Sequence, residues 1–215
     1  PAIEDVDSDG TLEVIVSSTE DALVAYSATD GTEEWRVSLP TYGYGRPTVA
    51  NVTPADGREI VTSDIEGNVA VVHGNGSVAW RVALNETQWS RASVWGAPVV
   101  EDLDADGAPE VFLGTSRGPV LLSADGAVEW QRNGSATTIA SAQVDDDPAV
   151  ELFTAGTSEL RAYDGETGDT EWSRDLTNTR IKTATDNDGD GVPELYVDQS
   201  GRFLALDAAS GETEW

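Results

Sequence analysis

The chain has 215 residues, of which 40 are acidic and 12 basic, and its formal net charge is −28. Such a charge excludes nucleic acid as a partner, because its phosphates would be repelled. The chain has no cysteine, which excludes disulfides, thiol nucleophiles and cysteine-ligated zinc. No apolar run reaches the length that spans a membrane. The apolar residues recur in a regular pattern, which indicates a folded protein rather than an acidic disordered chain.

The basic residues are almost all arginine, with Lys182 as the only lysine. Strong self-repulsion is expected in dilute buffer, but at about 1 M salt the Debye length falls to ~3 Å and the repulsion largely disappears. Extreme acidity with arginine kept and lysine lost therefore predicts adaptation to high salt, of the haloarchaeal type.

The first 40 residues predict four short β-strands. Apolar or β-branched runs at residues 1–3, 13–16, 23–26 and 34–37 are separated by polar loops and a Thr-Asp-Gly turn. Short runs bounded by turn residues are typical of strands, and no window shows a sustained helical period. The first run is followed by an acidic loop that begins at Asp5.

The same pattern recurs along the whole chain. A Gly-x-x-x-Trp sequence ends at Trp35, Trp80, Trp130, Trp172 and Trp215, and an acidic loop or its remnant precedes each of them. Self-similarity at this period indicates a repeat architecture, and a four-stranded unit repeated radially is a propeller blade. We therefore expect an all-β fold, a single β-propeller domain with five visible blades at about 1–45, 46–96, 97–137, 138–180 and 181–215.

Two repeat families share these motifs. The ending Ala-x-Asp-x-x-Ser-Gly-x-x-x-Trp (205–215) resembles the tryptophan-docking repeat of PQQ-like β-propellers. The openings at 1–14 and 98–111 resemble the FG-GAP repeat of integrin α-chain propellers, although Glu stands at the ninth loop position where integrins usually carry Asp. The resemblance implies tryptophans packed between blades and acidic loops that bind Ca²⁺ on one face, and five blades are fewer than these families usually have.

The acidic loops are the predicted metal sites. Carboxylates at alternate positions converge if the loop coils around an ion, Gly at position 6 permits the turn, and Ca²⁺ takes roughly six to eight oxygens. Three loops are intact, the fourth is partial because Gln143 and Pro148 replace Asp and Gly, and the second (51–59) is expected to bind nothing. We expect Ca²⁺ ions that act as structural staples. The predicted ligands are Asp5, Asp7, Asp9, Glu13, Asp102, Asp104, Asp106, Glu110, Asp186, Asp188, Asp190 and Glu194, with Asp145, Asp147 and Glu151 in the partial loop.

Four asparagines lie in Asn-x-Ser/Thr sequons, namely Asn51, Asn75, Asn85 and Asn133. Such sequons are acceptors for N-glycosylation in secreted proteins. They predict an extracellular or cell-surface glycoprotein; the alternative is accidental matches in a threonine-rich sequence.

The resemblance implies that the loops that join one blade to the next lie on the face opposite the acidic loops, and two of these loops are long. They carry aromatic residues beside arginine, which could stack on a sugar or hold an anionic partner; the alternative is local packing at the end of the propeller. The candidates are Tyr42, Tyr44, Arg46, Trp89, Arg91 and Trp95.

No catalytic residues are predicted. The only histidine, His73, precedes a Gly-Asn-Gly turn and is expected to be a surface turn residue. With no cysteine and one histidine, a nucleophile–base pair is not expected. The innermost strands are mainly apolar or small, which argues against catalysis in the central channel.

These observations favour a non-catalytic, calcium-stabilised extracellular β-propeller that acts in cell-surface structure, adhesion or protein–protein assembly. Its partners would be proteins, surface polysaccharide or further copies of itself. A second interpretation is a propeller-type carbohydrate-active enzyme, hydrolase or lyase, or a carbohydrate-binding module, and a third is a periplasmic-type scaffold for protein assembly. Because the chain begins inside a unit's first strand, we expect it to be a processed or excised piece.

Overall fold

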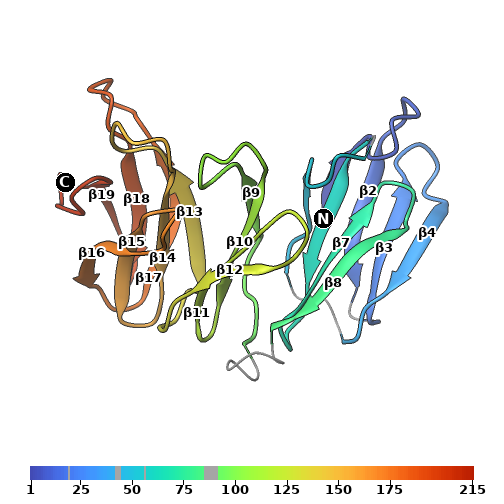
Figure 1. The fold of residues 1–215 in the computed structure, drawn as a ribbon, viewed down its shortest axis with the longest axis horizontal. Helices are drawn as coiled ribbons and strands as arrows, with labels where there is room; N and C mark the ends of the chain where they lie inside the picture. The colour runs from blue at the N-terminus through green and yellow to red at the C-terminus, as the bar shows by residue number, and fades with distance from the viewer. Residues whose placement is uncertain (19, 42–44, 56, 85–91) are drawn as a thin grey trace.

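The computed structural model describes residues 1–215 except 19, 42–44, 56 and 85–91. Within the described residues the chain forms five antiparallel sheets in a row, each built from consecutive strands (Figure 1). We refer to these sheets as blades 1 to 5 in chain order. The all-β prediction and the five repeats are thereby confirmed.

Blades 1, 2 and 3 contain the first twelve strands. These are β1 (Ala2–Glu4), β2 (Glu13–Ser18), β3 (Ala22–Ser27) and β4 (Glu33–Ser38); β5 (Thr48–Ala50), β6 (Glu59–Ser63), β7 (Asn68–His73) and β8 (Val78–Ala83); and β9 (Val99–Glu101), β10 (Glu110–Thr115), β11 (Gly118–Leu122) and β12 (Val128–Gln131).

Blades 4 and 5 contain the remaining strands. These are β13 (Thr138–Ala142), β14 (Glu151–Ala155), β15 (Glu159–Tyr163) and β16 (Thr170–Asp175), then β17 (Thr179–Thr185), β18 (Glu194–Gln199) and β19 (Arg202–Asp207). β17 begins two residues before the boundary expected from the sequence.

Each blade is an antiparallel meander, and blades 1 to 4 share one irregularity at the same place. The pairing of the third and fourth strands shifts at Ala25/Tyr26, Val71/Val72, Leu121/Leu122 and Ala162/Tyr163 in blades 1 to 4. A β-bulge of this kind bends a strand and increases its twist. It lies next to the third-to-fourth-strand turn, where Gly76 and Gly126 adopt the positive φ that the hairpin pattern predicted.

The hydrophobic cores lie between neighbouring blades. Ile15 and Ile60 belong to the core between blades 1 and 2, while Phe112 and Tyr163 pack between blades 3 and 4. Because both faces of an internal blade are covered, β6, β10 and β14 are buried along their whole length, including the glutamate with which each begins.

The last blade differs from the prediction of four strands. It contains three strands, and the segment after β19 makes a single bridge from Thr213 to Leu206. The row of blades is also not closed, because blades 1 and 5 lie at opposite ends of it (Figure 1). Among the described residues no helix has the length and apolarity to cross a membrane.

Candidate functional site

The acidic loops project from one edge of the row of blades. Each joins the first and second strands of its blade, and in Figure 1 all of them rise on the upper side. This arrangement follows from the repeat, since an identical meander places equivalent loops on the same side.

The backbone of the intact loops coils through two residues of positive φ. Position 6 is Gly10, Gly107 or Gly191, with φ of 92°, 93° and 98°, as the sequence predicted. Position 4 is also left-handed, and there the chain places Ser8, Ala105 and Gly189. The positive φ was predictable only at position 6. Glycine adopts positive φ readily, whereas serine and alanine, which occupy position 4 in two of the loops, do so rarely.

The coiled loops bring carboxylates together. In four loops, carboxylate oxygens from three or four residues lie within 4.8 Å of one another. Two of the predicted ligands, Asp9 and Asp106, are not in these groups. Their Oδ1 atoms accept hydrogen bonds from the backbone N–H groups of Thr11 and Ala108, each at 2.7 Å, and Asp190, which is in a group, accepts the equivalent bond from Val192 at 2.9 Å. The groups are Asp5, Asp7 and Glu13; Asp102, Asp104 and Glu110; Asp145, Asp147 and Glu151; and Asp186, Asp188, Asp190 and Glu194.

The glutamate at position 9 is buried and holds the start of its own loop. Its Oε2 accepts the N–H of the residue seven positions earlier, as in Glu13 to Val6 at 2.9 Å and Glu110 to Leu103 at 2.7 Å. Glu151 accepts from Val144 in the same way, but its Oε1 is buried without a hydrogen-bond partner. A buried oxygen without a partner is costly, so this atom calls for a cation or a proton.

Burial and neighbouring charges disfavour ionisation of Glu110 and Glu151. Desolvation, with a further contribution from Asp104, raises the pKa of Glu110 to about 7. Desolvation, with contributions from Glu171 and Asp145, raises the pKa of Glu151 to about 7. A divalent cation at the loop would reverse this balance, because an opposite charge favours the ionised form.

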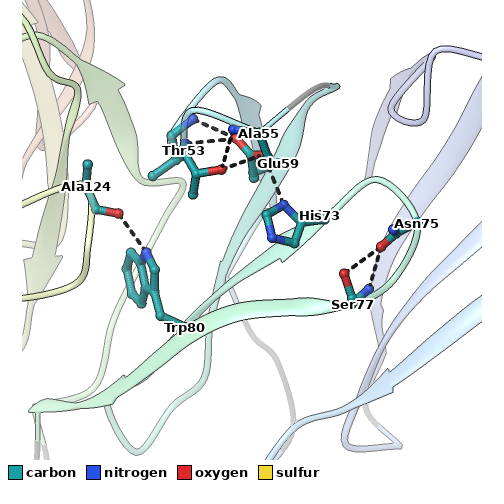
Figure 2. Close-up of polar contacts among 9 residues, drawn as sticks. Thr53, Ala55, Glu59, His73, Asn75, Ser77, Trp80 and Ala124 are labelled. Carbon is teal, nitrogen blue, oxygen red and sulfur yellow. Dashed lines mark hydrogen bonds and ion pairs between the residues drawn. The ribbon is translucent and has the colours of Figure 1, made fainter.

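The second loop stabilises its glutamate with protein groups instead (Figure 2). Glu59 Oε2 accepts the N–H groups of Val52 and Thr53 at 2.8 and 3.1 Å. Glu59 Oε1 accepts from Thr53 Oγ1 at 3.1 Å and lies 3.2 Å from His73 Nδ1. Burial alone would raise the pKa of Glu59, but these hydrogen bonds outweigh it and lower the pKa.

The prediction that His73 is a surface turn residue is therefore wrong. His73 is the last residue of β7, its side chain is half-buried, and it contacts the glutamate of the degraded loop. The imidazole of His73 lies beside the buried carboxylate of Glu59.

Sequence reasoning missed a second set of carboxylates. Glu34, Glu129, Glu171 and Glu214 each precede the repeat tryptophan, and desolvation together with the charges of the adjacent acidic loop raises the pKa of each. In blade 2, whose loop is degraded, the same position is Ala79. The signal was present in the sequence, because Glu-Trp occurs in the four units that keep acidic loops.

The repeat tryptophans connect neighbouring blades, as predicted. The indole Nε1–H of Trp35 donates to the Gly74 carbonyl at 2.7 Å. That of Trp80 donates to the Ala124 carbonyl at 2.8 Å (Figure 2). Trp130 and Trp172 make the equivalent bonds to Gly165 and Ala208, both at 2.9 Å. Each ring also lies against the turn glycine of the next blade.

A cleft of about 870 Å³ lies at the opposite ends of the strands. It is lined by Arg46 and Trp95, two of the predicted ligand-face residues, together with Arg180, Asn178 and Asp198. Its size is that of a ligand pocket. The other four candidates, Tyr42, Tyr44, Trp89 and Arg91, lie outside the described residues.

Three of the sequon asparagines are exposed. Asn51 begins the second loop, Asn75 lies in the β7–β8 turn and Asn133 in a bend after β12. The Oδ1 of Asn75 accepts from Ser77 N and Oγ (Figure 2). Asn85 lies outside the described residues.

The repeated meander and the interblade indole bonds define this chain as a β-propeller protein of PQQ-like repeats. The family model described as outer membrane protein assembly factor BamB matches residues 5–215, and the chain belongs to this family.

Solved structures with a similar fold come from several organisms. They include Saccharomyces cerevisiae Sqt1 (TM-score 0.73, 12% identity, 95% of this chain and 57% of that chain). They also include Moraxella catarrhalis BamB (TM-score 0.67, 18% identity, 100% of this chain and 62% of that chain). A third is the Vibrio cholerae biofilm matrix protein Bap1 (TM-score 0.61, 13% identity, 100% of this chain and 68% of that chain). The chain thus spans between 57% and 68% of these structures. No curated protein sequence matches it.

Proposed function

We propose that this chain is a non-catalytic, calcium-stabilised propeller module that acts in protein–protein assembly at the cell surface or outside the cell. The family is described as outer membrane protein assembly factor BamB, and the structures of similar fold include a BamB and a biofilm matrix protein. A rigid row of sheets with loops on both edges suits a scaffold that presents contacts to other proteins.

The observation that carries the calcium proposal is the oxygen cluster repeated in four loops, with carboxylate oxygens within 4.8 Å of one another. In each loop the glutamate uses Oε2 to hold the backbone. One carboxylate oxygen of each of these glutamates lies within 4.8 Å of the aspartate oxygens, and the Oε1 of Glu151 has no hydrogen-bond partner. Crowded hard oxygens of this kind suit Ca²⁺, and the resemblance to FG-GAP loops points to the same ion.

The proposed ions are structural staples for the connection between the first and second strands. A ligand that binds only the native state stabilises it by ~2.7 kcal/mol at a concentration of about a hundred times Kd. For a chain of this length, 1 kcal/mol corresponds to roughly 2–4 °C in Tm. Each occupied site should therefore raise the melting temperature by about 5–11 °C.

The test is thermal unfolding with excess Ca²⁺ and with chelator at constant ionic strength. We expect a higher Tm with Ca²⁺ than with chelator, and a smaller gain in Tm with an equal concentration of Mg²⁺. If the ions only screened charge, the two gains in Tm would be equal. The D186N/D188N double variant should lose part of the gain, whereas T53A in the second loop should keep all of it. An equal Tm with Ca²⁺ and chelator would refute the structural role.

The remaining parts of the proposal concern location and contacts. The exposed sequon residues Asn51, Asn75 and Asn133 suit a secreted glycoprotein, and the acidic, lysine-poor composition suits high salt. The cleft that contains Arg46, Arg180 and Trp95 offers cations and an aromatic ring to an acidic protein segment or a surface polysaccharide. Intact-mass analysis of native material tests glycosylation, because unmodified protein would have the mass of the bare chain.

A further inference from the structure

The bulge between the third and fourth strands leaves one residue of the fourth strand outside the ladder in blades 1 to 4. In blade 4, Ala162 pairs with Trp172 and Tyr163 pairs with Thr170. Glu171, between the two, has no partner in the ladder, and a bulge of this kind re-aims a side chain. The equivalent unpaired residues in blades 1 to 3 are Glu34, Ala79 and Glu129. We call Glu34, Glu129 and Glu171 the bulge glutamates.

The sheet register places the bulge at the end of the blade that carries the acidic loop. In blade 4 the loop enters β14 at Glu151, and the next residue, Leu152, pairs with Tyr163. Tyr163 in turn pairs with Thr170, which precedes Glu171. Glu151 and Glu171 are therefore both adjacent to the same row of the sheet.

Each bulge glutamate lies close enough to the position-9 glutamate of its own loop for their charges to interact. Desolvation, followed by the charge of Glu13, raises the pKa of Glu34. Desolvation raises the pKa of Glu151, and the charge of Glu171 contributes more to this rise than that of Asp145. Because the bulge glutamates are exposed, their side chains are free to turn.

Blade 2 shows that the bulge itself does not require a glutamate. It has the same bulge, but the unpaired residue there is Ala79. Blade 2 is also the blade with the degraded loop, in which Thr53 and Ala55 stand where intact loops have aspartate. The glutamate therefore occurs together with the acidic loop and not simply with the bulge.

We propose that the bulge glutamates are further ligands of the Ca²⁺ ions in their blades, so that each ion binds the fourth strand as well as the acidic loop. This inference rests on the proposed calcium binding. Blade 4 carries the clearest sign of a ligand, because Glu151 is fully buried and its Oε1 has no hydrogen-bond partner. One carboxylate oxygen of Glu151 lies within 4.8 Å of oxygens of Asp145 and Asp147.

The coordination of calcium explains why a further carboxylate is needed. The acidic loops of blades 1, 3 and 4 each bring together three carboxylates, whereas Ca²⁺ takes roughly six to eight oxygens. The bulge glutamates do not belong to these groups, because like charges repel at short distance. A divalent cation reverses the sign of this interaction, so the glutamate side chain turns toward the ion.

Ligation by the fourth strand would connect calcium binding to the contacts between blades. Glu171 precedes Trp172, whose indole Nε1–H donates to the Ala208 carbonyl of the next blade at 2.9 Å. An ion that holds Glu171 therefore also holds the strand that carries this indole. Calcium would then stabilise the interface between blades as well as the loop.

Isothermal titration of the whole chain with Ca²⁺ in about 1 M salt tests the proposal. The E34Q/E129Q/E171Q variant keeps the size of each side chain and removes its charge, and it should raise the Kd for Ca²⁺ by about 10–100-fold, the range for residues around a metal site. The matched control is E20Q/E66Q/D175N, which removes three exposed acidic charges at the opposite edge of the blades. It should bind like the wild type, because the Debye length is ~3 Å in this salt.

A third variant separates a ligand from a nearby charge. E34D/E129D/E171D keeps the charges and shortens each side chain by one methylene, so it should also lose affinity if the carboxylates contact the ion. With chelator the glutamine variant should melt no lower than the wild type, because it lacks three crowded charges, whereas its gain in Tm with Ca²⁺ should be smaller.

The outcomes distinguish this inference from the proposed function. Calcium binding by the wild type with an unchanged Kd in the glutamine variant would overturn the inference and leave calcium binding intact. Wild-type affinity in the aspartate variant, or an equal loss of affinity in the control, would overturn it as well. A wild-type chain that binds no Ca²⁺ would refute the calcium proposal and this inference together.

Discussion

The contact between an indole and a turn glycine can be tested by adding one methyl group. Gly168 has φ of 66°, and a Cβ built there lies 2.6 Å from the Trp130 ring. Gly31 has φ of 75° in an equivalent turn, with no atom within 4 Å. In both turns the glycine N–H donates to the carbonyl four residues earlier, so G168A and G31A form a matched pair.

The expected costs differ because only one site is crowded. A non-glycine residue in the left-handed region costs about 1–2 kcal/mol, which applies to both variants. Displacing a packed ring adds about 1–3 kcal/mol, and this applies to G168A alone. At roughly 2–4 °C for each kcal/mol, G168A should melt about 2–12 °C below G31A.

The assay is thermal unfolding followed by tryptophan fluorescence. The two variants should differ in Tm and also in the environment of one indole, which becomes more exposed in G168A. Equal melting temperatures for G168A and G31A would refute the conclusion that the tryptophan contact stabilises the interface.

Three further predictions concern the indole bonds and the acidic loops. W172F removes the hydrogen bond to the Ala208 carbonyl and should cost about 1 kcal/mol in denaturant unfolding; no change would contradict a role for that bond. H73Q removes the group that faces Glu59 and should cost about 1–3 kcal/mol with chelator present, measured in the same way. In the metal-free protein, the pKa of Glu110 and Glu151 rises from 4.5 to about 7 on folding. The folded state then binds more protons, so its stability falls as pH rises from about 4.5 to about 7, and Ca²⁺ should remove this dependence; a flat Tm profile with chelator would contradict it.

The repeat architecture could be predicted from the sequence because its signals are local and recur five times. Short apolar runs predicted the strands, turn glycines predicted the hairpins, and the spacing of the tryptophans predicted the blades. The last blade was the exception, because a fourth strand after β19 depends on pairing with Ala205 and Leu206 and no local pattern determines how far that pairing extends.

The acidic loops were only partly predictable for a physical reason. Spacing showed that carboxylates converge, but it could not show which oxygens the backbone itself would use. Asp9 and Asp106 bond to N–H groups two residues ahead, and Glu13 bonds to an N–H seven residues back. Contacts between segments, such as His73 with Glu59, depend on sheet register and were not accessible from composition or spacing.

The central claim is that the acidic loops bind Ca²⁺, and the number of ions bound per chain tests it most directly. Equilibrium dialysis against millimolar Ca²⁺ in high salt, followed by elemental analysis, should give one ion for each of the four carboxylate groups. The D186N/D188N variant should bind one ion fewer and T53A the same number as the wild type. A chain that binds no Ca²⁺, or a D186N/D188N variant that binds as many ions as the wild type, would contradict the account.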